Sequence, residues 1–206
     1  MKKLITTLLL ANLAALTAFA APTCCKTNPP ATAPLTDASL YQIETTWTSD
    51  HDKPVQLSQL RGQVQIVTLF FASCQFACPI LVHDMKKIEA GLAAAGITNV
   101  GFLLVTIDPD RDTVEALHTF REQRRLDDRW LLLRSSDLQD TLELAALLGI
   151  KYKKEPTGQY AHSNLITLLN QNGEITHQQP GLNTDPAPMI AAIQTLLTPN
   201  KIPDAR

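Results

Sequence analysis

The chain has 206 residues, of which 45% are hydrophobic, and a formal net charge of −2 at pH 7. This length is sufficient for one domain with a substantial hydrophobic core. The sequence contains no cluster of five or more Lys and Arg residues. It therefore lacks the basic footprint of a nucleic-acid-binding protein, and that class is excluded.

The first twenty residues have the pattern of an export signal. Lys2 and Lys3 precede an apolar run from Leu4 to Leu16, and Ala18-Phe19-Ala20 is a small-residue cleavage site. Threonine and asparagine interrupt the run, so it matches poorly the ~20 apolar residues of a membrane span. We expect residues 1–20 to be removed on export to the periplasm, and contact with a membrane to occur only through a partner.

Residues 21–38 contain four prolines and few residues that could pack into a core, which is typical of an extended linker. The linker carries Cys24 and Cys25. Ala21-Pro22-Thr23 does not match the residues that precede a lipid-modified cysteine. The cysteines could be auxiliary copper ligands, an exchangeable thiol pair, or thiols without a role. The folded domain is expected at 39–199, followed by a tail at 200–206.

The first half of the domain predicts a parallel sheet. Apolar and polar residues alternate over 40–47 as in a strand, and residues 49–54 are the expected turn to a second short strand. Residues 64–71 and 100–107 are apolar and rich in β-branched side chains, as in strands buried on both faces. Helical periodicity over 80–95 ends at Gly96 and completes a βαβ unit.

The second half predicts two helices, a hairpin and a last helix. Asp112 is the expected cap of a helix that ends near Arg125. A strand at 130–133 and a helix at 138–148 follow. Asn172-Gly173 is the expected turn of a hairpin formed by 165–169 and 174–178, and 186–197 form the last helix. This order predicts an α/β thioredoxin-like sandwich, with a central mixed sheet flanked by helices.

Cys74 and Cys78 lie between a predicted strand and a predicted helix. This places them at the carboxyl edge of the parallel sheet, where α/β proteins bind ligands. The partial positive charge of the helix start favours thiolates, so the pKa of either thiol should be low. Two cysteines at this spacing could form a disulfide or chelate one soft metal ion, and the spacing does not decide between the two.

Three segments, in order, resemble the Sco/SenC family of copper proteins. Residues 70–79, FFASCQFACP, resemble its cysteine motif, and residues 108–113, DPDRDT, its acidic motif. His162, just before an apolar strand, is similar in place to the family's copper-binding histidine. Gln75-Phe76-Ala77 departs from the more polar residues usual between the cysteines, so redox tuning or partner recognition could differ.

The resemblance implies a function in assembling the binuclear copper centre of cytochrome c oxidase. Cys74, Cys78 and His162 would bind copper as Cu(I) or Cu(II), and the partner would be the copper-accepting oxidase subunit or a related copper enzyme. The alternative is a thiol-disulfide reductase in which Cys74 and Cys78 exchange between dithiol and disulfide. Thioredoxin-type oxidoreductases usually have a proline where this strand opens with His162-Ser163-Asn164, which favours metal binding.

Other polar and sulfur-containing residues have structural interpretations. Asp108-Pro109 is the expected start of a turn, and Arg111 could pair with Asp108 or Asp112. We expect Met85 and Met189 to lie in the core. The remaining histidines are interpreted as surface residues: His51, His83, His118 and His177.

Overall fold

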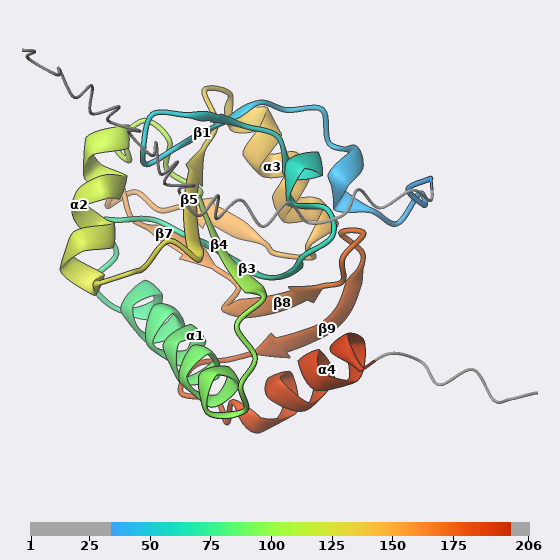
Figure 1. The fold of residues 1–206 in the computed structure, drawn as a ribbon. Coiled ribbons are helices and arrows are strands. Elements are labelled where there is room, and N and C mark those ends of the chain that lie inside the picture. The colour runs from blue at the N-terminus through green and yellow to red at the C-terminus, as the bar shows by residue number, and fades with distance from the viewer. Residues whose placement is uncertain (1–33, 199–206) are drawn as a thin grey trace, which may run out of the picture.

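The computed structural model describes residues 34–198, which form a mixed sheet between two layers of helices (Figure 1). The sheet has seven strands in the order β2-β1-β5-β4-β3-β8-β9. Its strands are β1 (Trp47–Ser49), β2 (Pro54–Val55), β3 (Val64–Phe70), β4 (Val100–Thr106), β5 (Trp130–Arg134), β8 (Leu165–Leu169) and β9 (Ile175–Pro180). Two further strands, β6 (Tyr152–Lys154) and β7 (Tyr160–His162), form a separate hairpin.

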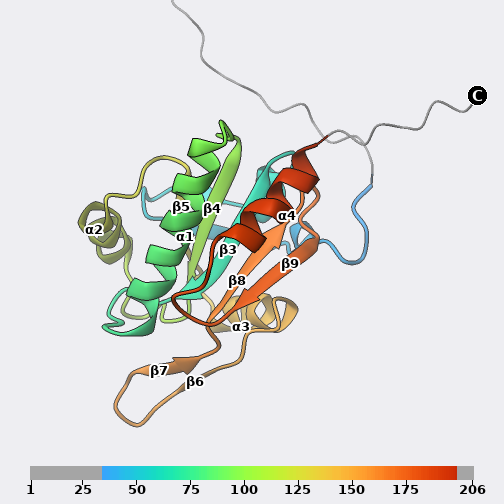
Figure 2. The same cartoon turned by 90° about the horizontal axis from the view of Figure 1, so that it is seen from below.

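The three central strands β3, β4 and β5 are parallel, and every residue of β3 and β4 is buried. The four helices are α1 (Ala77–Ala94), α2 (Val114–Arg124), α3 (Leu138–Leu147) and α4 (Ala187–Leu197). Helix α1 covers one face of the sheet with α2 and α4 beside it, and α3 covers the other face (Figures 1 and 2). This arrangement agrees with the predicted α/β sandwich.

The buried face of α1 explains how the helix is fixed on the sheet. Leu81, Met85, Ile88 and Leu92 recur at helical spacing, and each is at most 1% exposed. Met189 on α4 is also fully buried, so the prediction that both methionines belong to the core is confirmed. Among residues 34–198, no helix is long and apolar enough to cross a membrane.

Two segments of the chain differ from the sequence prediction in their secondary structure. Residues 40–47 were expected to form one strand, but Leu40–Gln42 form a 3-10 turn and only Trp47 enters β1. The turn forms because the Ser39 hydroxyl accepts the backbone N–H of Tyr41 while Leu40 and Tyr41 pack into the core. The β6–β7 hairpin was not predicted, because its short strands are largely exposed and lack an apolar alternation.

The β8–β9 turn provides a test of the packing. Gly173 has φ +79°, and a Cβ atom there would lie 2.6 Å from the Tyr41 ring. Gly173→Ala should lower the free energy of unfolding by about 1–2 kcal/mol for the left-handed backbone and by a further ~1–3 kcal/mol for the overlap. Gly149→Ala is the matched control, because Gly149 has φ +69° and nothing within 4 Å. If denaturant unfolding gives the same loss of free energy of unfolding for both variants, the Tyr41 contact is contradicted.

Candidate functional site

The two cysteines lie in the turn that joins β3 to α1. The backbone N–H of Cys74 donates to the Phe71 carbonyl over 3.1 Å, which closes the turn directly after the strand. Helix α1 begins at Ala77, and its N-cap residue Phe76 makes no side-chain capping bond. Instead, the Cys78 N–H lies 3.4 Å from Cys74 Sγ, so the sulfur accepts a hydrogen bond from the first helical turn.

The pKa values of the two thiols are shifted in opposite directions. The hydrogen bond from the Cys78 side chain lowers the pKa of Cys74 to about 5, and backbone N–H groups of residues 76–78 assist while burial partly opposes. The same hydrogen bond, together with burial, raises the pKa of Cys78, so the predicted low pKa is confirmed for Cys74 and wrong for Cys78. Both cysteines are free thiols and are buried. Cys74 is therefore a thiolate at neutral pH, and Cys78 is its proton-bearing partner.

His162, at the end of β7, brings an imidazole to the cysteine turn. Its Nε2 atom lies 3.6 Å from Cys78 Sγ. Its Nδ1 atom lies 3.1 Å from the Ser163 carbonyl oxygen, which can only accept. In the neutral ring Nδ1 therefore carries the proton and Nε2 directs its lone pair at the thiols. The edge of the ring also faces Phe71, with centroids 6.1 Å apart.

The hairpin that carries His162 is tied to the loop after β4. Arg111 donates to the Asp108 carboxylate and, over 2.5 Å, to the Gly158 carbonyl in the hairpin turn. Tyr160 Oη lies 3.5 Å from Asp108 Oδ1, and its ring packs against Phe71 with centroids 5.6 Å apart. These contacts hold β7, and with it His162, over the cysteine turn.

The position of Asp112 shows that the prediction of this residue as a helix cap is wrong. Thr113, not Asp112, caps α2, because the Thr113 hydroxyl accepts the Ala116 N–H over 3.2 Å. The buried Asp112 carboxylate instead accepts the Thr106 hydroxyl and, over 2.9 Å, the Ala72 N–H. Burial raises the pKa of Asp112. Asp112 thus fixes the backbone that leads into the cysteine turn.

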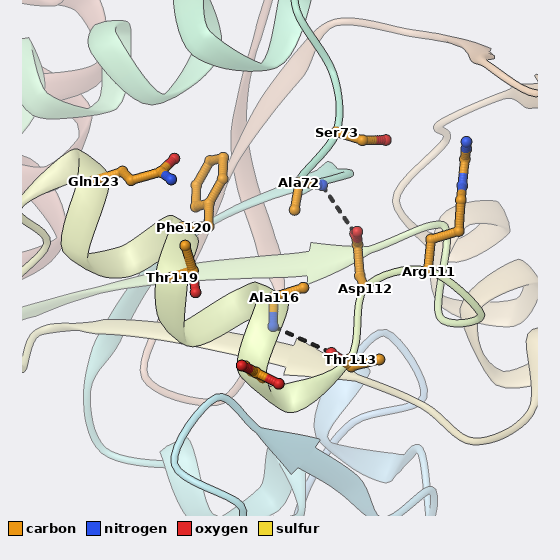
Figure 3. A pocket seen from close by; sticks show the side chains of 10 residues that line it. Ala72, Ser73, Arg111, Asp112, Thr113, Ala116, Thr119, Phe120 and Gln123 are labelled. Atoms are coloured by element: carbon orange, nitrogen blue, oxygen red, sulfur yellow. Dashed lines mark hydrogen bonds between the residues drawn. The ribbon is translucent and has the colours of Figure 1, made fainter.

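A pocket and an exposed aromatic side chain lie next to the cysteine turn. A pocket of about 430 Å³ extends from Ser73 along α2, with Asp112 at its wall (Figure 3). Phe76, between the cysteines, is 82% exposed. An aromatic side chain this exposed beside a reactive pair is available for contact with a partner protein.

The sequence profile of the SCO1/SenC family matches residues 34–198. The chain belongs to this family. A Stutzerimonas stutzeri protein named as copper-binding is 27% identical over 129 residues, which span 61% of this chain and 62% of that relative's length. The chain therefore aligns with less than two thirds of this relative.

Solved SCO1/SenC structures confirm the thioredoxin-like fold. A SCO1/SenC family lipoprotein from Bacillus anthracis is 26% identical, with a TM-score of 0.69, over 74% of this chain and 92% of that one. BsSco, described as a member of the Sco family of cytochrome c oxidase assembly proteins with a disulfide switch, is 25% identical. Its TM-score is 0.66, over 76% of this chain and 93% of BsSco.

The structure brings the predicted donors Cys74, Cys78 and His162 of this SCO1/SenC chain to one place. Their function as metal ligands, and a disulfide between the cysteines, remain predictions. Asp108 begins the expected turn, since its carbonyl accepts the N–H groups of Arg111 and Asp112 over 3.2 and 2.9 Å. Cys24, Cys25, the export signal and the tail lie outside the described residues.

Sequence reasoning missed the residues that position His162. Tyr160 and Gly158 were not singled out, although Pro156-Thr157-Gly158 is a turn signal between two tyrosines. That signal could have indicated the β6–β7 hairpin. The contact of Gly158 with Arg111 spans 47 residues, and no local pattern encodes it.

The pKa of about 5 makes Cys74 the reactive thiol. Its alkylation by iodoacetamide should be nearly independent of pH from about 6.5 to 8 and should slow as the pH falls through about 5, because the thiolate is the nucleophile. Cys78 should react far more slowly. Glutathione is the control with an ordinary thiol. Below its pKa of ~8.5, its rate of alkylation should rise about tenfold for each unit of increasing pH. Peptide-resolved mass spectrometry measures both sites, and a glutathione-like profile for Cys74 would contradict the proposed stabilisation.

Proposed function

We propose that this protein binds copper through Cys74, Cys78 and His162 and delivers it in the assembly of the copper centre of cytochrome c oxidase or a related copper enzyme. The proposal rests on one observation, which is that the Nε2 atom of His162 lies 3.6 Å from Cys78 Sγ, beside a second thiol of low pKa. Two sulfurs and one imidazole are a soft donor set that suits copper.

The donor set supports binding of both copper oxidation states. Thiolates are soft ligands that stabilise Cu(I), and an imidazole adds affinity for Cu(II). The hydrogen bond between His162 Nδ1 and the Ser163 carbonyl fixes the ring orientation, as outer contacts of metal-binding histidines usually do. The names of the Stutzerimonas relative and of BsSco, a Sco family assembly protein, agree with this function.

A thiol-disulfide reductase is the second candidate, and the difference in acidity between the two thiols favours it. A thiolate at Cys74 could attack a target disulfide, forming a mixed disulfide and releasing one target thiolate. Cys78, once deprotonated, would then attack the Cys74 sulfur and release the second target thiol. The target gains two electrons, and the protein keeps a Cys74–Cys78 disulfide. Both activities would use the same two sulfurs.

The proposed place of action is the periplasm. The export pattern of residues 1–20 supports it. The Bacillus anthracis relative, named as a lipoprotein, agrees with export. The proposed partner is the copper-accepting subunit of the oxidase, and the exposed Phe76 beside the cysteines is the side chain best placed to contact it.

Because Cu(I) is softer than Cu(II), substitutions of the cysteines and of His162 should affect the two ions differently. Cys74→Ser or Cys78→Ser should abolish tight Cu(I) binding, because each removes a thiolate. His162→Ala should weaken Cu(II) binding by about 100-fold or more, since loss of outer-shell partners alone costs about 10–100-fold, and should affect Cu(I) far less. Anaerobic titration measures the affinity for Cu(I), and Cu(II)–thiolate absorption measures Cu(II) binding. His83→Ala, an exposed histidine on α1, is the control, and unchanged absorption in His162→Ala would exclude that residue.

Protection from alkylation distinguishes the two candidate functions. A Cys74–Cys78 disulfide removes the thiolates, so oxidised protein should bind almost no Cu(I), and reduction should restore binding. One equivalent of Cu(I) should conversely protect both thiols from alkylation, because a ligand of the reduced form stabilises that form. Equal labelling with and without Cu(I) would exclude the copper site and leave the reductase. Reduction of a model disulfide is assayed in parallel.

A further inference from the structure

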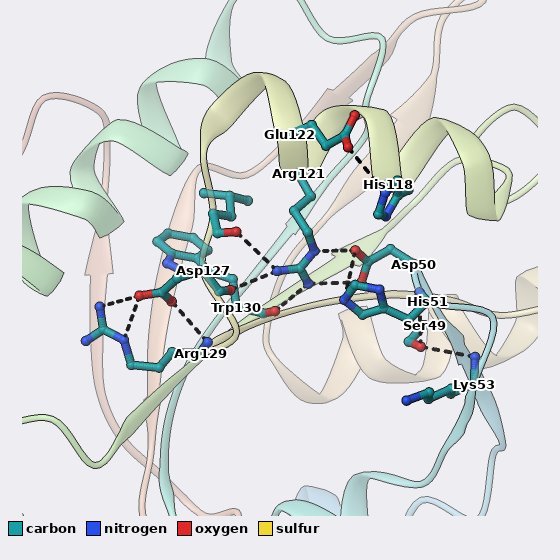
Figure 4. Close-up of polar contacts among 11 residues, drawn as sticks. Ser49, Asp50, His51, Lys53, His118, Arg121, Glu122, Asp127, Arg129 and Trp130 are labelled. Carbon is teal, nitrogen blue, oxygen red and sulfur yellow. Dashed lines mark hydrogen bonds and ion pairs between the residues drawn. The ribbon is translucent and has the colours of Figure 1, made fainter.

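A second group of potential metal ligands lies between the β1–β2 turn and helix α2. Asp50, His51 and His118 each offer one donor atom, and these three atoms lie within 4.8 Å of one another. The two imidazole rings are 5.7 Å apart between centroids, in an edge-to-face arrangement (Figure 4). Sequence analysis interpreted both histidines as surface residues, and 67 positions separate them in the chain.

A buried ion pair holds the two histidines together. Arg121 on α2 donates through Nε and Nη2 to the two carboxylate oxygens of Asp50, and both side chains are at most 8% exposed. Arg121 also donates to the Trp130 carbonyl of β5. The ion pair therefore fixes the β1–β2 turn against α2. His51 directly follows Asp50, and His118 is one helical turn before Arg121, so both imidazoles are placed by this pair.

The charges around the histidines favour a cation. The positive charge of Arg121 is matched by Asp50, with which it forms two hydrogen bonds. Glu122 adds a second carboxylate, with Oε1 3.5 Å from His118 Nε2, one helical turn along α2. Both imidazole side chains are 46% exposed, so an ion can reach them from solvent.

We propose that His51 and His118, together with the carboxylates of Asp50 and Glu122, form a second metal site that takes a borderline divalent ion, Cu²⁺ or Zn²⁺. Imidazole and carboxylate donors suit these ions, and sites with two histidines and one acidic residue bind zinc in other proteins. The site contains no sulfur. It therefore differs in metal preference from the cysteine site and does not depend on the proposed function.

The geometry requires only small side-chain movements. In the tetrahedral geometry of zinc sites, bonds of about 2 Å from one ion place its ligand atoms ~3.3 Å apart. The donor atoms now lie within 4.8 Å of one another, so the imidazoles need to approach by up to about 1.5 Å. Their exposure permits this rotation. The buried Asp50–Arg121 pair does not need to move.

The test uses the mature chain with all four cysteines replaced by serine and with His162→Ala, so that the first site and the linker thiols cannot bind. Cu²⁺ and Zn²⁺ are titrated separately by calorimetry. We expect each ion to bind, Cu²⁺ more tightly. Zn²⁺ should shift the imidazole NMR signals of His51 and His118, and Cu²⁺ bound there should show nitrogen hyperfine coupling.

Variants of this background identify the ligands. His51→Ala and His118→Ala should each lower the affinity by about tenfold or more, and Glu122→Gln should have a smaller effect. His83→Ala, which removes an exposed imidazole elsewhere on the surface, should change nothing. The proposal is wrong if Zn²⁺ leaves the His51 and His118 signals unshifted, or if His83→Ala weakens binding as much as His51→Ala. In either case the two rings make an aromatic contact only.

Discussion

The buried carboxylate of Asp112 joins the three segments on which the cysteine turn depends. It accepts the Ala72 N–H just after β3 and the Thr106 hydroxyl at the end of β4, and Asp112 directly precedes Thr113, the N-cap of α2. The carboxylate is desolvated, and burial raises its pKa. A group buried at this cost persists only where it is hydrogen-bonded, and its bonds in turn hold the backbone two residues before Cys74 in place.

The same loop also positions the third candidate ligand. Residues 108–112 contain Asp112 and also the ion pair of Asp108 with Arg111. In the β6–β7 hairpin, Arg111 contacts Gly158 and Asp108 contacts Tyr160. Contacts from one short segment after β4 therefore position both the cysteine turn and His162. A displacement of this loop would separate the imidazole from the thiols without altering any of the three side chains.

The contrast between the two thiols explains why copper binding and disulfide exchange are difficult to separate at this site. One hydrogen bond lowers the pKa of Cys74 and raises that of Cys78, which gives one stable thiolate and one protonated partner. A thiolate is both a soft metal ligand and a nucleophile. The neighbouring imidazole is the feature that a dithiol reductase would not require, and it therefore carries the argument for copper.

Local sequence patterns determined the buried strands, the main helices and the strand-to-helix position of Cys74 and Cys78, because apolar periodicity and turn residues act over a few positions. Family resemblance, not spacing, selected His162. Tertiary packing alone decided that Thr113 caps α2 while Asp112 turns inward, since both residues are acceptable caps. It also decided the 3.6 Å approach of His162 to Cys78 across 84 residues, and the pairing of His51 with His118. Such contacts are set by how the sheet edge, hairpin and helices pack, which no local pattern records.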